Sequence, residues 1–404
     1  MRSVVLRVLF ALVLFALFQE IVLRAIFPLR EVLNFDRFSY SLLEEHAEGA
    51  SFRSLGHAAF SWASDPDGFE FVHRLNLYGF RDDDWPLRGS AAVLRVAFVG
   101  DSLVEGFSAV AESAIPEVFE HLARERGLKL ATLNLGVGGA DLPQYERLVR
   151  DSVPLFRPDV VILVFYANDL DSPPRFDPGW LEGASEPEFS NVWEPRLLYV
   201  LRHVRSRQAV PRRWTGRPFT YLEAVPDPRN PYSSEAMAIE LDARVAPRLA
   251  EAMKQGRLNP WMASRFPGVR NTLARSVYVS AHLRAIDAYV ERFGSDLFVV
   301  YLPFREQVSD RYLPFAVELS AWGSVTSVMG EEFQKHAWHL GQACAALSIP
   351  FLDLTPGLRR LEAGGPALYW NYDDHLRDRG YRAAAELIFD WWRNTSASGG
   401  DRGS

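Results

Sequence analysis

The sequence predicts an α/β domain built around a parallel sheet. Short apolar runs alternate with stretches of helical spacing, first over residues 93–170 and again over residues 271–394. This alternation is typical of right-handed β-α-β crossovers, which place successive strands parallel in one sheet. The run Val160–Phe165 is apolar throughout, as expected for a strand that is buried on both faces.

The first half of this domain contains three expected strands separated by two expected helices. Each strand is an apolar run, and each helix repeats its apolar residues with helical spacing. The strands are expected at Val93–Val99, Lys129–Leu135 and Asp159–Phe165, and the helices near Ile115–Arg126 and Leu142–Asp151.

The second half continues the same alternation and ends on a helix, which brings the expected number of parallel strands to five. Its elements are expected at Thr272–Phe293 (helix), Leu297–Leu302 (strand), Gly330–Leu347 (helix), Pro350–Leu354 (strand) and Tyr381–Trp392 (helix).

A long segment separates the two halves. Residues 171–270 are rich in Pro, Trp and Arg and contain one clear helical stretch, Ser234–Lys254. A structureless loop of that length is unusual in a compact domain, so we expect an insertion. Two interpretations remain open: a cap beside a functional site, or a peripheral addition.

The segments outside the domain are simpler. Residues 29–92 are expected to be an N-terminal extension in which Phe69–Arg74 and Leu75–Phe80 pair as a short hairpin. Residues 395–404 are small and polar, which predicts a disordered tail.

The N-terminus carries a targeting signal. Arg2 and Arg7 precede the unbroken apolar run Val8–Phe18, and apolar character resumes up to Phe27. We expect residues 1–28 to be an uncleaved signal anchor, a single transmembrane helix in a bacterial inner membrane; a cleaved signal peptide is the alternative. Because the arginines stay cytoplasmic, either interpretation places the domain in the periplasm or outside the cell.

Composition excludes several classes of partner. The net charge is −7 and the pI is near 5.8, and no stripe of Lys or Arg is visible, so nucleic acid is not an expected partner. The single cysteine, Cys344, excludes an intrachain disulfide and a cysteine-based zinc site. No metal or cofactor is implied.

Four short motifs are expected to meet at one edge of the sheet. Ser102 follows the first strand in Gly-Asp-Ser, Gly139 follows the second in a glycine-rich turn, and Asn168 follows the third. His375 lies just before the last helix, with Asp373 two residues before it. The carboxyl ends of parallel strands are where ligands bind in open α/β sheets. A serine beside a histidine base and amide donors is the combination of groups that nucleophilic catalysis uses.

Together these motifs resemble the SGNH (GDSL-type) hydrolase superfamily over about residues 93–169 and 276–392. The resemblance implies a flavodoxin-like three-layer sandwich with strand order 2-1-3-4-5. It also implies that Ser102 is the nucleophile, that Ser102, Gly139 and Asn168 line an oxyanion hole, and that His375 is the base.

Two departures from the family pattern stand out. Tyr166 occupies the position of the usual glycine before Asn168, and Tyr372 stands where an aspartate usually lies three residues before the histidine. The Asp373-Asp374-His375 run is similar to the Asp-x-His arrangement of the membrane-anchored branch that includes alginate O-acetylation proteins. The resemblance therefore implies that Asp373 orients His375.

The implied function is an extracytoplasmic serine esterase or O-acyltransferase. Its substrate would be an ester-linked acyl group on a small molecule or polysaccharide, with a carbohydrate favoured. The alternative is a non-catalytic surface or envelope-assembly protein that retains the same scaffold.

Overall fold

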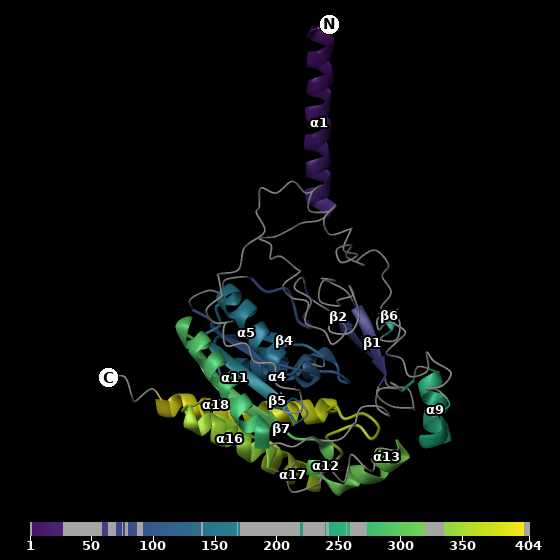
Figure 1. The fold of residues 1–404 in the computed structure, drawn as a ribbon, viewed down its shortest axis with the longest axis vertical. Helices are drawn as coiled ribbons and strands as arrows, with labels where there is room; N and C mark the ends of the chain where they lie inside the picture. The colour runs from purple at the N-terminus through teal and green to yellow at the C-terminus, as the bar shows by residue number, and fades with distance from the viewer. Residues whose placement is uncertain are drawn as a thin grey trace.

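The fold is that of an α/β domain with a parallel sheet between helices (Figure 1). It was obtained as a computed structural model. The structure describes residues 2–26, 59–63, 70–74, 76, 80–86, 92–138, 140–167, 169, 219–220, 239, 242–255, 257–258, 273–319 and 335–399.

The central sheet has five strands in the order β4-β3-β5-β7-β8, and every neighbouring pair is parallel. In chain order this is 2-1-3-4-5, so the expected strands and their flavodoxin-like order are confirmed. The strands are β3 (Leu94–Gly100), β4 (Leu130–Gly136), β5 (Val160–Tyr166), β7 (Asp296–Leu302) and β8 (Phe351–Asp353).

Helices cover both faces of this sheet. Phe98 of β3 pairs in register with Ile162 of β5, so Phe98 and Phe165 point to opposite faces. The Phe98 ring contacts Phe119 of α4, whereas the Phe165 ring contacts Tyr145 of α5. Helices α4 and α18 therefore form one outer layer, and α5, α11 and α16 form the other.

The helices of the domain include all the expected ones, together with α17, which was not predicted, and several short elements. The long helices are α4 (Ile115–Glu125), α5 (Leu142–Phe156), α11 (Leu273–Arg292), α16 (His336–Ala346), α17 (Thr355–Ala363) and α18 (Asp378–Gly399). The short ones are α3 (Ser102–Glu105), η2 (Ala111–Ser113), α12 (Arg305–Val308), η8 (Asp310–Tyr312) and α13 (Leu313–Glu318).

The N-terminal hairpin exists, but its second partner was predicted wrongly. Strand β2 (Glu70–Arg74) pairs with β1 (Ala59–Ala63), and β1 also pairs with β6 (Phe219–Thr220). Of the expected strand Leu75–Phe80, only Asn76 and Phe80 lie among the described residues, and neither is in a strand. Asn76 accepts the Phe80 N–H through its side chain and donates its own N–H to the Phe80 carbonyl.

The helix predicted in the insertion is interrupted. Residues 242–244 and helix α9 (Pro247–Lys254) are helical, but residues 245–246 between them are not, so a continuous Ser234–Lys254 helix is wrong at this point. Pro247 explains the break, because proline disfavours helical geometry in the residue before it. Ala246 accordingly has φ −54° and ψ 133°. The rest of the proposed cap lies outside the described residues.

The C-terminal helix is longer than expected. Helix α18 continues to Gly399, and Thr395 Oγ1 donates to the Trp391 carbonyl at 2.9 Å within it. The predicted disordered tail therefore does not begin at residue 395; residues 400–404 lie outside the described residues.

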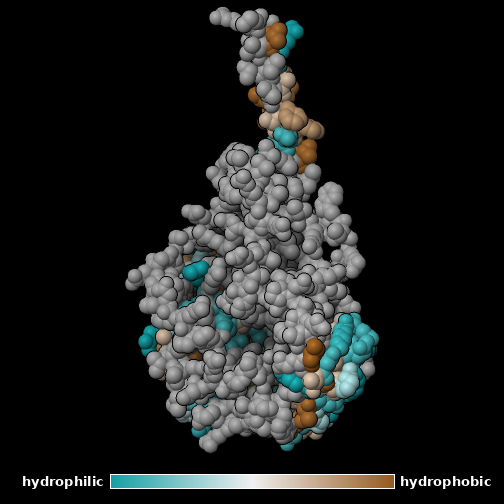
Figure 2. Space-filling model, turned by 45° about the vertical axis from the view of Figure 1, so that its right-hand side comes forward, coloured by the Kyte–Doolittle hydropathy of each residue, from teal (hydrophilic) through white to brown (hydrophobic). Residues whose placement is uncertain are grey.

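The N-terminal segment is one helix, α1 (Arg2–Ile26), which projects from the rest of the molecule (Figure 1). Apolar side chains are exposed along it, Phe10 and Ile21 among them (Figure 2). Among the helices that the structure describes, none is both long and apolar enough to cross a membrane. The predicted transmembrane helix is thus not supported.

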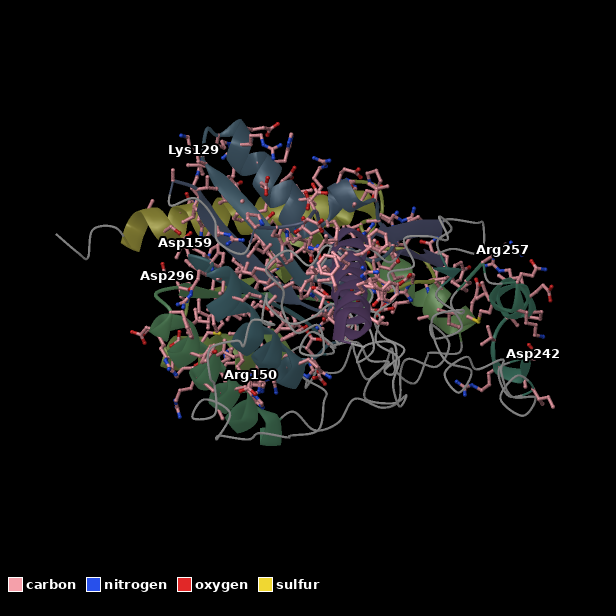
Figure 3. All side chains as sticks on the ribbon, turned by 90° about the horizontal axis from the view of Figure 1, so that it is seen from above. Lys129, Arg150, Asp159, Asp242, Arg257 and Asp296 are labelled. Atoms are coloured by element: carbon pink, nitrogen blue, oxygen red, sulfur yellow. The ribbon has the colours of Figure 1, made fainter. Side chains whose placement is uncertain are left out.

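The two ends of the sheet face different surroundings. Lys129, Asp159 and Asp296, which precede or begin β4, β5 and β7, lie on one side of the molecule (Figure 3). Asp242 and Arg257, which flank α9, lie on the opposite side (Figure 3). Helix α9 therefore lies on the side of the carboxyl ends of the strands.

Candidate active site

Ser102 begins the short helix α3 directly after strand β3. The Asp101 carboxylate caps this helix by accepting the Leu103 N–H at 2.8 Å, which fixes the turn between strand and helix. The helix passes so close to β4 that a Cβ on Gly136 would overlap the backbone N of Glu105. A glycine at the end of β4 is thus needed to seat Ser102 at the sheet edge.

His375 reaches Ser102 from a loop that lies 273 residues further along the chain. We call residues 101–109 the serine loop and residues 369–376 the histidine loop. His375 Nε2 lies 2.7 Å from Ser102 Oγ, and both side chains are buried. The Phe107 ring stacks on the imidazole with centroids 5.3 Å apart, which limits rotation of the His375 ring.

Asp373 holds the other side of the imidazole. Its Oδ1 is hydrogen-bonded to His375 Nδ1 and also accepts the His375 backbone N–H at 3.0 Å. The neighbouring Asp374 has its Oδ1 3.6 Å from the same Nδ1, beyond hydrogen-bond distance. The structure thus joins Ser102, His375 and Asp373 in one hydrogen-bonded chain.

The serine loop is held by a buried arginine from the N-terminal extension. Arg81 donates to the carbonyls of Gly106 and Ala109, the latter at 2.7 Å, and reaches the Glu105 carbonyl at 3.4 Å. Burial lowers the pKa of Arg81, because a charged guanidinium loses its hydration there.

A second buried arginine holds the histidine loop. Arg305 Nη1 donates to the carbonyls of Trp370, Asn371 and Asp373 at 3.0, 2.8 and 3.2 Å. Its Nε pairs with the buried Glu306 at 2.7 Å. The loop that carries Asp373 and His375 is therefore positioned through its backbone.

Tyr166, which stands where the SGNH pattern has a glycine, makes a contact that a glycine could not make. The side chain is fully buried at the end of β5, and its hydroxyl lies 3.3 Å from both the carbonyl and Oδ2 of Asp374. A glycine could not make this link. Tyr166 thus ties the third strand to the histidine loop and engages the carboxyl group that does not hydrogen-bond His375.

The glycine-rich turn after β4 is tied to the serine loop. Glu105 Oε2 accepts the Gly138 N–H at 2.8 Å. Gly139 and Asn168, the other expected oxyanion donors, lie outside the described residues. Asp169, next to Asn168, accepts from Tyr145 Oη at 2.6 Å and from the Tyr166 N–H. Burial, followed by the nearby Asp101, holds the pKa of Asp169 well above its usual range.

One cluster in the described part of the chain has the composition of a metal site. Ligand atoms of Asp373, Asp374 and His375 all lie within 4.8 Å of one another. Their hydrogen bonds to Ser102, Ser108 and Tyr166 account for the arrangement without an ion. The expectation that no metal or cofactor takes part stays a prediction.

Three contributors to the site were not predicted as site residues: Arg81, Arg305 and Ser108. Arg81 and Arg305 lie in the stretches Asn76–Arg81 and Tyr301–Val308, which loosely match the membrane-anchored branch of the family. Nothing in the local sequence marks Ser108, whose Oγ donates to Asp373 Oδ2 at 2.8 Å.

The fold and the site together define an α/β protein with a Ser-His-Asp cluster at the carboxyl edge of a parallel sheet. No protein-family model and no curated protein matches the chain. Solved structures similar to it include a lipase/acylhydrolase from Enterococcus faecalis, with 12% identity, TM-score 0.37, and coverage of 74% of this chain and 94% of that one.

Two acetylxylan esterases are similar to the same extent. The enzyme AlAXEase shares 12% identity at TM-score 0.37, over 74% of this chain and 98% of its own. A catalytic mutant of the Geobacillus stearothermophilus enzyme shares 13% identity at TM-score 0.37, over 75% and 94%. Likeness at this level adds no argument about activity, which therefore depends on the site.

Proposed function

We propose that the chain is a serine esterase or O-acyltransferase of the SGNH type, with Ser102, His375 and Asp373 as its catalytic triad. The observation that carries the proposal is the hydrogen-bonded chain from Ser102 Oγ, 2.7 Å from His375 Nε2, through the imidazole to Asp373. Nucleophile, base and orienting carboxylate in this order are the defining geometry of such sites.

In the proposed reaction, Ser102 Oγ attacks the ester carbonyl carbon while His375 Nε2 takes the hydroxyl proton. The tetrahedral intermediate collapses to an acyl ester on Ser102, and His375 returns the proton to the leaving alcohol. Asp373 keeps the proton of the neutral imidazole on Nδ1 and stabilises the charged form. Water then releases the acyl group as an acid, or a second hydroxyl accepts it as a new ester.

The oxyanion would be stabilised by backbone N–H groups of Ser102 and Gly139 and by the Asn168 amide. The first N–H groups of a helix have no partner within it, so the Ser102 N–H at the start of α3 is suited to this task. Because Glu105 already engages the Gly138 N–H, Gly139 is the better donor in that turn.

For the substrate, we propose an acyl ester on a carbohydrate. The Asp-x-His run at Asp373–His375 and the Tyr301–Val308 stretch, which resemble the alginate O-acetylation branch, support this choice. We also propose that the domain acts outside the cytoplasm, since Arg2 and Arg7 precede the apolar core Val8–Phe18, a pattern typical of exported chains.

The decisive experiment is hydrolysis of p-nitrophenyl acetate by the full-length chain and by Ser102→Ala. We expect Ser102→Ala to lose on the order of 10⁴-fold or more in kcat/KM and to resist labelling by a fluorophosphonate. Ser295→Ala, which removes another buried serine hydroxyl, is the control and should keep its activity. Inactive wild-type protein, or labelling that survives in Ser102→Ala, would contradict the proposal.

Two further measurements test whether the acyl group is transferred or hydrolysed and whether the domain is exported. Adding an oligosaccharide to the assay and weighing it by mass spectrometry separates transfer from hydrolysis, because only transfer adds acetyl to the sugar. Protease treatment of intact and permeabilised cells tests export; protection of the domain in cells stripped of their outer membrane would contradict it.

A further inference from the structure

The Ser108 side chain connects the serine loop directly to Asp373. Its hydroxyl donates to Asp373 Oδ2 at 2.8 Å, while Oδ1 of the same carboxylate faces His375. We propose that Ser108 is a positioning residue that holds the Asp373 carboxylate in the orientation His375 requires. This inference rests on the proposed esterase function.

The backbone at Ser108 is unusual. Its φ is +64°, in the left-handed region that favours glycine and costs free energy for other residues. Such a conformation persists only where the surroundings over-determine it, and it is concentrated at functional sites. A serine in place of glycine here indicates that its hydroxyl is needed.

The surroundings do over-determine this conformation. Four consecutive carbonyls of the serine loop each accept from a buried side chain. The donors are Arg81 to Gly106 and Ala109, Tyr381 to Phe107 at 2.7 Å, and Trp370 Nε1 to Ser108 at 2.9 Å. The loop is thus clamped from both sides of the site, which places the Ser108 hydroxyl reproducibly.

The Ser108 hydroxyl restricts the rotation of the Asp373 carboxylate. Because Ser108 binds Oδ2 while His375 binds Oδ1, the carboxylate cannot turn about its Cβ–Cγ bond without breaking a charge-assisted hydrogen bond. Ser102 and Ser108 belong to the same clamped loop. One rigid segment therefore fixes both the nucleophile and the carboxylate, with the imidazole between them.

The test compares Ser108→Ala with Ser108→Gly in the full-length chain, on the same activated ester. Both variants lose the hydroxyl, but glycine adopts φ +64° without strain. We expect kcat to fall about 10- to 100-fold in both, with KM nearly unchanged, and Ser108→Gly to melt at a higher temperature than Ser108→Ala. Wild-type kcat in Ser108→Gly would overturn the inference.

A double-mutant cycle shows whether Ser108 works through Asp373. In an Asp373→Ala background, Ser108→Ala should lower kcat no further, because the carboxylate that it positions is absent. If Ser108→Ala lowers kcat by the same factor in both backgrounds, its effect is on the fold in general and the inference is wrong.

Ser295→Ala is the matched control. Ser295 is also buried, and its hydroxyl donates to the Pro158 carbonyl at 2.6 Å, at the opposite end of the sheet. Its replacement should lower the melting temperature and leave kcat unchanged. Normal kcat in the Ser108 variants beside an inactive Ser102→Ala would refute the positioning role alone; an active Ser102→Ala would refute the proposed function itself.

Discussion

A buried arginine holds the serine loop and another holds the histidine loop, but the pKa values of the two arginines are shifted in opposite directions. Arg81 binds carbonyls of the serine loop, and burial lowers its pKa. Arg305 binds carbonyls of the histidine loop; burial opposes its charge as well, but Glu306 and then Asp374 outweigh burial and the pKa of Arg305 is raised.

The difference matters because the two loops have different tasks. The serine loop carries Ser102 and two buried carboxyl groups, Asp101 and Glu105, which accept backbone N–H groups. The histidine loop carries the imidazole that would gain and lose a proton in the proposed reaction, next to two buried carboxyl groups, Asp373 and Asp374. Arg305 differs from Arg81 in its direct ion pair with the buried Glu306, whereas the hydrogen bonds of Arg81 go to carbonyl groups.

The largest expected effect distinguishes the two acids of the histidine loop. Asp373→Asn should lower kcat/KM by about 10²–10⁴-fold, because an amide in contact with Nδ1 favours the wrong tautomer of His375. Asp374→Asn should stay within about threefold of wild type, since its carboxylate lies 3.6 Å from Nδ1. Steady-state kinetics on one activated ester measures both; the reverse ranking would show that Asp374 orients the base.

The next effect compares how much Arg305 and Arg81, the two arginines that hold the loops, contribute to stability. Arg305→Met should destabilise the chain by about 3–5 kcal/mol, because it leaves the buried Glu306 without its partner. Arg81→Met removes donors from carbonyls and weakens the attraction to Glu105; it should cost about 1–3 kcal/mol. Urea unfolding of both variants measures the difference.

The control for this pair is the double variant Arg305→Met with Glu306→Gln. Neutralising Glu306 should recover part of the stability lost in Arg305→Met, because the stranded charge is then gone. Equal losses in Arg81→Met and Arg305→Met, with no recovery in the double variant, would show that the ion pair makes no difference between the loops.

The smallest effect concerns two carboxyl groups on the Arg81 side. Burial, followed by Glu117, raises the pKa of Asp82 well above its usual range, and burial followed by Glu120 raises that of Glu117. The folded chain therefore binds more protons than the unfolded one. Their stabilising contribution is complete below about pH 4 and is lost as pH rises through the raised values.

Glu117→Gln should make this loss shallower. Relative to wild type, the variant should gain stability between about pH 5 and about pH 8, by under about 1.5 kcal/mol. Melting temperatures across that range provide the measurement. Glu386→Gln, at an exposed position of α18, should show no such trend. If Glu117→Gln keeps the wild-type pH profile, the pair Asp82 and Glu117 does not cause the loss of stability.

The sequence by itself determined the sheet and the principal site residues. Apolar runs such as Val160–Phe165 mark buried strands through local composition alone, and the residue that follows such a strand reaches its carboxyl edge whatever surrounds it. Ser102 was predictable for this reason, and His375 was predictable from its place in a recognisable motif before the last helix. The shared edge of a parallel sheet then brings such positions together.

Only the tertiary structure decided how the site is held. Ser108 meets Asp373 across 265 residues, and Arg81 and Arg305 reach carbonyls of loops that no local pattern connects to them. The pairing of β2 with β1 was likewise decided by the tertiary structure. The physical reason is that backbone carbonyls are present at every residue, so only the folded path of the chain selects which of them a buried donor binds.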